Sequence, residues 1–255
     1  APGYLDSATA ATRQHMEQHI LRPLPSPNYP FVQYDSWQYG PGINETEMMK
    51  DIAMAQQIGL EAFVLDYGWA AAFGSWRADP IKFPNGLKPL ADAARNAGMR
   101  FGVQIPLGQA SFGSDLLTAL PECAVQSQQS DYYNSVGICL SHAPCQEFLL
   151  TAVGKLFADG VNYIVTDAWD MVKVCPSSNH THSPGDSNWS NSVDGFDAVI
   201  TAMRAMQPDL ILEFCASGGT MQSLQMTRLF DTSIAGDNSM SSITRMSVYG
   251  QTVVF

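Results

Sequence analysis

Hydrophobic and polar positions divide the chain into two kinds of segment that alternate. Short apolar runs, rich in β-branched and aromatic residues, end in polar or small residues. Each run is followed by a longer segment in which apolar residues recur every three to four positions. The first pattern is typical of a strand and the second of a helix that buries one face. The sequence therefore predicts a repeated strand–helix unit.

Seven apolar runs fit the pattern expected of strands. Most of them are apolar at consecutive positions, as parallel strands covered on both faces require. The predicted strands are Phe31–Trp37, Ala62–Trp69, Arg100–Pro106, Tyr163–Trp169, Leu210–Ala216, Thr232–Asn238 and Thr252–Phe255.

The predicted helices carry recognisable end signals. Asn44 is placed to cap one helix, and Gly59 lies just beyond its end. Gly98 and Gly160 end two further helices in the same way. We interpret the apolar stripes on these and the following helix as packing surfaces: Met48, Ile52 and Ala55; Leu87, Leu90, Ala91 and Ala94; Phe148, Leu149, Ala152, Val153 and Leu156; Phe196, Val199, Ile200 and Met203.

Repeated units of this length favour either a closed (β/α)8 TIM-type barrel or an open doubly wound sheet. No GxGxxG or GxxxxGK[ST] motif follows the first strand, which disfavours the nucleotide-binding open sheet. We therefore predict an α/β fold of the barrel type. Because a barrel needs eight strands and seven are counted, we expect it to be incomplete at the C-terminus and the chain to be a fragment of a longer protein.

Two regions are expected along the chain. Residues 1–28 contain a leading amphipathic helix, about Ala8 to Leu21, and a Pro-rich linker that begins at Arg22 and cannot continue the helix. Residues 29–255 contain the predicted barrel. A length of 255 residues with 45% hydrophobic residues is sufficient for one large core.

Charge and hydropathy exclude some classes of partner. The formal net charge is −11, from 24 acidic and 13 basic residues, and no run of Lys or Arg could follow a phosphate backbone. We therefore expect no nucleic-acid partner. No segment reaches the ~20 consecutive apolar residues of a membrane helix, so no membrane partner is expected. The N-terminus shows no signal-peptide pattern, and any such peptide is taken to be absent already.

The cysteines and histidines show no metal-binding motif. The five cysteines contain no CxxC and no Cys/His ligand spacing, so we predict no metal and no cofactor, while disulfides with an odd thiol left over are compatible. Surface roles are expected for the histidines: His15 and His19 on the leading helix, and His180 and His182 in a polar loop. Low charge, the cysteines and three sequons, at Asn44, Asn179 and Asn188, favour a secreted glycoprotein.

Four of the predicted strands carry an acid near their C-terminal end: Asp35, Asp66, Asp167 and Asp237. In a barrel these strand ends meet at one rim, where active sites lie. Because unpaired buried charge is costly, we favour a functional site over the alternative that the acids cap helices. Two positioned carboxylates without a metal motif suit glycosyl transfer.

Tryptophans are expected at the same rim. Trp37, Trp69, Trp76 and Trp169 each lie near the end of a predicted strand or soon after it. Aromatic rings at such positions can stack on a sugar, although each one could equally pack in the core.

Five motifs together resemble glycoside hydrolase family 36, the α-galactosidase family related to families 27 and 31. The resemblance runs from about Tyr34 to Gly250 and implies the same barrel fold. The motifs are Leu65-Asp-Tyr-Gly-Trp69, Trp76-Arg-Ala-Asp-Pro80, Lys82-Phe-Pro-Asn-Gly-Leu-Lys-Pro-Leu90, Cys215-Ala-Ser-Gly-Gly219 and Gly236-Asp-Asn238.

The resemblance implies catalytic roles for two of the acids. Asp167, at the end of the fourth predicted strand, corresponds to the family's nucleophile, and Asp237, in the sixth, to its acid/base. The implied reaction is retaining hydrolysis of terminal α-galactosyl residues through a covalent glycosyl-aspartate intermediate. Residues 29–255 would then form the catalytic barrel.

The resemblance also implies a set of substrate-binding residues. Asp66 corresponds to an acid that accepts hydrogen bonds from sugar hydroxyls, and Tyr67 follows it in the same motif. Cys215, Ser217 and Gly218 correspond to residues that line the sugar pocket. Trp37 and Trp76 are further candidates for substrate binding.

The sequence departs from the family pattern around the predicted pocket. Tyr67 stands where the family has a second acid, Val165-Thr166 where it has Lys-Trp, and Leu107-Gly-Gln109 replaces an acidic motif. These changes leave two alternatives open: a hydrolase or transglycosidase acting on a related α-sugar, such as an α-N-acetylgalactosaminide or a raffinose-type oligosaccharide, and a non-catalytic carbohydrate-binding barrel. The expected partner is a carbohydrate substrate, and a homo-oligomer is compatible with the sequence.

Overall fold

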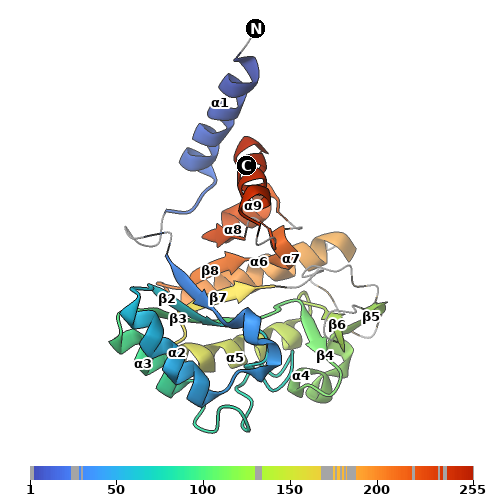
Figure 1. Cartoon of the computed structure of the whole chain (residues 1–255). Coiled ribbons are helices and arrows are strands. Elements are labelled where there is room, and N and C mark those ends of the chain that lie inside the picture. The colour runs from blue at the N-terminus through green and yellow to red at the C-terminus, as the bar shows by residue number, and fades with distance from the viewer. Residues whose placement is uncertain are drawn as a thin grey trace.

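A parallel sheet of six strands forms the centre of the molecule (Figure 1). The computed structural model describes residues 3–23, 29, 31–129, 134–167, 175, 177–178, 180, 182, 188–219, 222–234, 236–237 and 240–254. The strands follow the order β1 (Gln33–Asp35), β2 (Ala62–Leu65), β3 (Arg100–Gln104), β7 (Tyr163–Thr166), β8 (Ile211–Phe214) and β9 (Thr232–Ser233). This is a parallel half-barrel, which confirms the predicted fold class.

Helices follow the strands and cover one face of the sheet. Figure 1 shows α2, α3 and α5 beneath it. The α-helices are α1 (Tyr4–His19), α2 (Glu45–Gln57), α3 (Lys88–Asn96), α4 (Asp115–Ala119), α5 (Ala143–Asp159), α6 (Asn188–Met206), α7 (Ala216–Gly219), α8 (Leu224–Leu229) and α9 (Ser241–Val254), and the 3-10 helices are η1 (Ser36–Gly42) and η2 (Pro121–Cys123). Among the helices described, none has both the length and the apolar character that a membrane crossing requires.

The two faces of the sheet have different cores. Side chains alternate along a strand, so Phe63 and Leu65 pack against the helices while Val64 points the other way. The large helix-side core contains the apolar stripes predicted from the sequence. A smaller cluster forms the inner face of the half-barrel: Ala62, Val64, Tyr163, Val165, Ile211 and Cys215.

A three-stranded antiparallel sheet lies beside the half-barrel and was not predicted. Its strands have the order β4 (Gln109–Ser111), β6 (Ser135–Ile138) and β5 (Ala124–Gln129), and all three come between β3 and β7 in the chain. A disulfide joins Cys123, just before β5, to Cys145 in α5. Of the five cysteines, one pair is therefore bridged and Cys139, Cys175 and Cys215 are free and buried.

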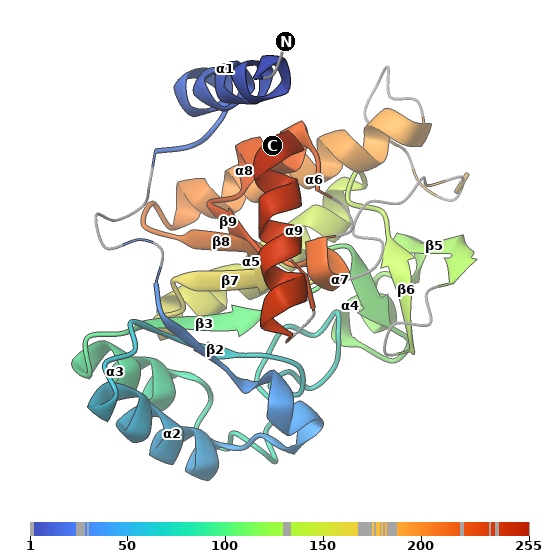
Figure 2. The same ribbon diagram turned by 45° about the horizontal axis from the view of Figure 1, so that its top comes forward.

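The predicted seventh strand is wrong. Thr252, Val253 and Val254 belong to α9, which lies on the opposite side of the sheet from α2 and α3 (Figures 1 and 2). β-branched residues favour strands only weakly, whereas each residue added to an existing helix gains a hydrogen bond. The prediction for Thr232–Asn238 was too long, since β9 ends at Ser233.

The predicted helix ends are confirmed. The Asn44 side chain accepts a hydrogen bond from the Glu47 N–H at 3.1 Å and so caps α2. Gly59, Gly98 and Gly160 adopt positive φ at the ends of α2, α3 and α5, a conformation that a side chain disfavours. The leading helix is confirmed as α1, which extends away from the sheet in Figure 1.

Close packing of α6 against the chain between β6 and α5 depends on Gly195. A Cβ atom at this position would lie 2.5 Å from the carbonyl carbon and oxygen of Leu140 and 2.6 Å from the amide nitrogen of Ser141. Because these are backbone atoms, they cannot move aside without moving the segment. Gly154 in α5 differs, since its added Cβ would meet only the flexible end of Met206, at 3.0 Å.

We predict that Gly195→Ala lowers the free energy of unfolding by about 2–3 kcal/mol, because overpacking outweighs the better helix propensity of alanine. Gly154→Ala is the matched control in a neighbouring helix, and we expect it to be neutral or to stabilise by up to about 1 kcal/mol. Urea denaturation of both variants measures the difference. Equal effects of the two substitutions would contradict the packing described here.

Candidate active site

Three acids lie at the C-terminal ends of parallel strands, on the inner face of the half-barrel. Asp35 ends β1, Asp66 follows β2 and Asp167 follows β7. Val64 and Val165 belong to the inner-face cluster, and side chains two positions further along a strand point the same way. The strand geometry therefore brings these carboxylates to one rim.

The electrostatics of the three acids confirm that they lie close together. Burial raises the pKa of Asp66 to about 7, and the negative charges of Asp35 and Asp167 contribute to the rise. Burial also raises the pKa of Asp35, and the charge of Asp167 adds to this effect. The Trp37 N–H, which donates to Asp35 Oδ1 at 2.8 Å, acts in the opposite direction. The ionised forms of Asp35 and Asp66 are therefore disfavoured both by burial and by the negative charges of their neighbours.

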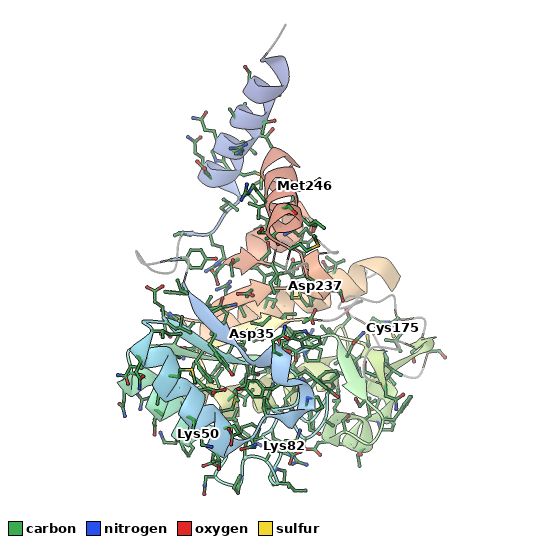
Figure 3. All side chains as sticks on the ribbon, viewed as in Figure 1. Asp35, Lys50, Lys82, Cys175, Asp237 and Met246 are labelled. Atoms are coloured by element: carbon green, nitrogen blue, oxygen red, sulfur yellow. A yellow bond between two sulfur atoms is a disulfide. The ribbon has the colours of Figure 1, made fainter. Side chains whose placement is uncertain are left out.

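Asp237 approaches the same rim from the segment after β9. Figure 3 labels both Asp237 and Asp35 near the middle of the molecule. Asp237 is exposed, yet partial burial raises its pKa and the charge of Asp167 raises it further. Asp167 is thus near enough for its charge to affect the protonation of Asp237.

An unusual turn connects Asp167 and Asp237. All four residues of α7, from Ala216 to Gly219, have positive φ, between 45° and 83°. The Ser217 N–H donates to Asp167 Oδ1 at 2.8 Å. A Cβ atom on Gly218 would lie 2.8 Å from the amide nitrogen of Asp237 and 2.9 Å from its carboxyl carbon. The turn therefore contacts both acids, and it needs glycine at the position next to Asp237.

The strain in this turn must be offset by interactions elsewhere in the structure. Ala216 and Ser217 carry side chains, and left-handed backbone costs such residues roughly 1–2 kcal/mol each. Outliers of this type cluster at functional sites, where the surrounding structure fixes them. Here the strain places one N–H donor on Asp167 and leaves room for the Asp237 carboxyl.

The remaining predicted site residues lie around this rim, with one exception. The Tyr67 N–H donates to the Asp66 carboxylate, and the Tyr67 ring meets the edge of Phe73 at 5.9 Å. Trp37 follows Asp35 in η1 and is 48% exposed. Cys215 lies on the inner face at the end of β8, where burial, followed by the charge of Asp167, raises the pKa of its thiol.

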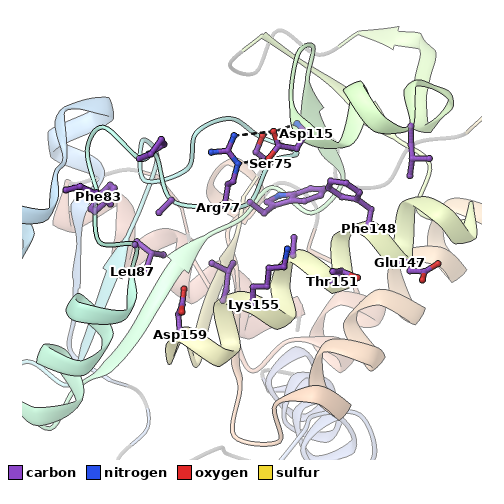
Figure 4. A pocket seen from close by; sticks show the side chains of 18 of the residues that line it. Ser75, Arg77, Phe83, Leu87, Asp115, Glu147, Phe148, Thr151, Lys155 and Asp159 are labelled. Atoms are coloured by element: carbon purple, nitrogen blue, oxygen red, sulfur yellow. Dashed lines mark hydrogen bonds and ion pairs between the residues drawn. The ribbon is translucent and has the colours of Figure 1, made fainter.

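Trp76 is the exception, because the structure places it away from the carboxylates. It is buried and its ring centroid lies 6.4 Å from that of Phe148 in α5. With Arg77 and Lys155 it lines a cavity of about 840 Å³ between α5 and the loop that precedes α3 (Figure 4). None of the strand-end acids lines this cavity. Trp69 is also a core residue, and Trp169 lies outside the described residues.

Two polar residues of the inner face were missed by sequence reasoning. Glu213 lies in the middle of β8, buried, where its carboxylate accepts hydrogen bonds from the Tyr163 hydroxyl and, at 3.4 Å, from Gln33 Nε2. Burial raises its pKa, although the bond from Tyr163 opposes the rise. A charged residue inside the apolar run Ile211–Phe214 was the available signal.

Gln104 at the end of β3 is the second missed residue. Leu65 pairs with Val103, so Asp66 and Gln104 occupy the next positions on neighbouring strands. Gln104 is buried, and its amide nitrogen and oxygen have no hydrogen-bond partner among the described residues. It lines a cavity of about 270 Å³ with Tyr67 and Lys82. A buried amide of this kind is available to a polar ligand.

The chain is similar to known proteins over most of its length. The Melibiase family model matches residues 10–255. α-Galactosidase 2 of Pediococcus pentosaceus is 29% identical over 191 residues, which cover 69% of this chain and 26% of that protein. α-Galactosidase Mel36A of Lactobacillus acidophilus is 24% identical over 250 residues, which cover 92% and 33%. The chain thus spans about a quarter to a third of the length of these relatives.

Solved structures share the fold. The family 36 α-galactosidase AgaA of Geobacillus stearothermophilus, solved in complex with stachyose, superposes with a TM-score of 0.80 at 18% identity, covering 98% of this chain and 36% of that one. A variant of AgaA solved with raffinose gives a TM-score of 0.74 at 19% identity, covering 88% and 33%. With a family match along nearly its whole length, the chain belongs to the Melibiase family, the family 36 α-galactosidases.

Proposed function

We propose that the protein is a retaining glycoside hydrolase for terminal α-galactosyl residues, with Asp167 as the nucleophile and Asp237 as the acid/base. The observation that carries this proposal is the strained turn Ala216–Gly219, which contacts both acids. A turn that only linked β8 to α8 would not need consecutive left-handed residues. The family relationship supports the reaction class.

In the first step, one Asp167 oxygen attacks the anomeric carbon of the sugar while the bond to the leaving oxygen breaks. Asp237 gives its proton to that oxygen, so the leaving group departs as an alcohol, and the glycosyl group remains attached to Asp167 as an ester. In the second step Asp237 removes a proton from water, the water attacks the same carbon, and Asp167 is released. The two inversions retain the α configuration, and the mechanism requires carboxyl groups roughly 5 Å apart.

The raised pKa of Asp237 suits this cycle. Burial and the charge of Asp167 raise the pKa of Asp237, which favours the protonated form that the first step needs. Ester formation removes the charge from Asp167, so the pKa of Asp237 falls when it has to act as a base. The Ser217 N–H, at 2.8 Å from Asp167 Oδ1, fixes the direction of the attacking carboxylate.

The other polar groups of the rim are proposed to hold the sugar. Asp66 and the unpartnered amide of Gln104 lie side by side and can accept from and donate to neighbouring hydroxyls. Tyr67 follows Asp66 in the chain and Trp37 lies in η1 just after Asp35, and both are proposed to offer aromatic surface to the sugar. Because AgaA was solved with raffinose and stachyose, we propose α-galactosyl oligosaccharides of this type as substrates. A related α-sugar remains the alternative, given Tyr67 and Val165 near the site.

We also propose that the protein is secreted. The disulfide between Cys123 and Cys145 supports this location, because such bonds persist in oxidising compartments. The sequon at Asn44 is compatible with it. Detection of the glycosylated protein in the culture medium of its source, and not in cell extracts, would test this location.

We predict that Asp167→Asn lowers kcat by roughly 10⁴-fold on every α-galactoside, because the nucleophile is lost. Asp237→Asn should lower kcat by roughly 10²–10⁴-fold on raffinose, whose leaving group needs a proton, and far less on aryl α-galactosides with activated leaving groups. Steady-state kinetics of the purified protein on both substrate types measures these effects.

Asp209→Asn provides the control, because Asp209 is an exposed acid just before β8, paired with Arg100 at 3.7 Å and distant from the rim. Its kinetics should match those of the unmodified protein. Wild-type rates in Asp167→Asn would overturn the assignment, and an equal loss on both substrate types in Asp237→Asn would remove its role as the acid. Binding of raffinose by an unmodified protein without turnover would support the carbohydrate-binding alternative instead.

The carboxylate cluster also predicts a cost in stability that depends on pH. The pKa of Asp66 is about 7 in the folded protein and about 4 in an unfolded chain, so folding at neutral pH places an unfavourable charge at the rim. Asp66→Asn keeps the acceptor for the Tyr67 N–H. We expect it to raise the free energy of unfolding by up to about 4 kcal/mol at pH 8, while lowering activity.

The gain should disappear near pH 4, where the Asp66 carboxyl is protonated and resembles the amide. Urea denaturation at both pH values tests this sign. The exposed Asp92, whose pKa is lowered by its hydrogen bond with Lys88, is the matched control, and Asp92→Asn should not stabilise the protein at pH 8. A loss of stability in Asp66→Asn at pH 8 would indicate a structural role for this acid.

A further inference from the structure

Four metal-ligating side chains meet on the flank of the half-barrel, outside the carboxylate rim. Cys139 directly follows β6, while Cys175, His180 and His182 come from the part of the chain between β7 and α6. One potential ligand atom from each lies within 4.8 Å of all the others. Figure 3 shows Cys175 near the antiparallel sheet and well separated from Asp237. No other group of this kind occurs among the described residues.

The distances in this cluster suit a tetrahedral zinc ion. Zinc binds sulfur at about 2.3 Å and imidazole nitrogen at about 2.0–2.1 Å, so tetrahedral ligands lie about 3.5 Å apart for S and N and about 3.3 Å apart for N and N. The Cys175 Sγ lies 3.4 Å from His180 Nε2, and the two Nε2 atoms of His180 and His182 lie 3.1 Å apart. No two of the four ligand atoms lie more than 4.8 Å apart, so the other pairs need to contract by at most about 1.3 Å to reach the spacing of such a site.

The ligand types favour zinc over other cations. Two thiols and two imidazoles form a soft donor set without carboxylates, which disfavours calcium and magnesium. Both cysteines are buried and both histidines are half-buried, as is typical of a structural site. We infer that Cys139, Cys175, His180 and His182 form a four-coordinate structural zinc site.

The surroundings of the cluster fix its geometry from one side. The Cys139 N–H donates to the carbonyl oxygen of Cys123, which is itself bridged to Cys145. The ring of His142, at the start of α5, stacks on that of His180 with centroids 4.4 Å apart. A zinc ion here would connect Cys175, His180 and His182 to Cys139, which the hydrogen bond to Cys123 holds in place. Because all four positions are filled by protein, the site has no open position for catalysis.

This site was not predicted from the sequence. Cys139 is far from the other three ligands in the chain, and the spacing from Cys175 to His180 and His182 matches no common zinc motif. Surface roles were expected for His180 and His182, whereas both are half-buried and face each other. The site is independent of the proposed glycosidase function, since none of its ligands belongs to the carboxylate rim.

Metal analysis of the untagged protein, purified without chelators, tests the inference. We expect one zinc ion per chain, bound through dialysis, and a lower melting temperature after removal with a strong chelator that is restored by zinc. Cys175→Ser and His180→Ala should each lose the bound zinc. If these variants fail to fold, cobalt substitution of the unmodified protein tests the site instead. Cobalt in a tetrahedral site with two thiolates gives intense visible bands and thiolate-to-cobalt charge-transfer bands.

The control removes the exposed pair His15 and His19 on α1, whose rings also lie close together at 4.8 Å. The double variant His15→Ala/His19→Ala should keep its zinc. Thiol titration of the denatured, unreduced protein after chelation distinguishes the main competitor, a second disulfide: the zinc site predicts three free thiols, and a Cys139–Cys175 bond predicts one. A single free thiol, or no bound zinc and no octahedral-to-tetrahedral change with cobalt, would overturn the inference.

Discussion

The contact between the turn Ala216–Gly219 and two aspartates is the interaction on which the rest of the site depends. Four consecutive residues adopt left-handed backbone, which is unfavourable for Ala216 and Ser217. The conformation is retained because it directs the Ser217 N–H to Asp167 and leaves only hydrogen at Gly218, where Asp237 packs. Without this turn, β7 and the segment after β9 would bring two negative groups to the rim with nothing to set their relative position.

Much of the fold could be predicted because it follows from local patterns. Buried parallel strands are apolar at consecutive positions, and β2, β3, β7 and β8 were found where such runs occur. The acids Asp35, Asp66 and Asp167 were found because a strand end is visible in sequence and parallel strands all end at one rim. The strand predicted at Thr252–Phe255 was wrong because three consecutive β-branched residues form the same apolar pattern at the end of a helix as in a strand. The antiparallel sheet was missed because its strands pair with segments that lie far from them in the sequence.

The site could be predicted less completely, for reasons of long-range geometry. Trp76 lies in a family motif, yet it packs on Phe148 in α5, and no local pattern separates a core tryptophan from one that faces a pocket. Glu213 and Gln104 were missed in the opposite way, since each is polar within an apolar run and only the alternation of the strand shows that it faces inward. The four zinc ligands come from two separate parts of the chain. Their meeting depends on where β6 and β7 place the segments that follow them.

The structure divides the tasks of stability and chemistry between the two faces of the sheet. On the helix side, the apolar core buries large side chains such as Phe63 and Phe101 and offsets the entropy of ordering the chain. On the inner face, burial raises the pKa values of Asp35, Asp66 and Asp237, and repulsion between neighbouring acids adds to each rise. Because its acids repel one another, the rim does not stabilise the position of the segments that carry them. Cross-links that carry no rim charge are therefore expected outside it, and the Cys123–Cys145 bridge and the adjoining four-ligand cluster lie on the flank of the half-barrel.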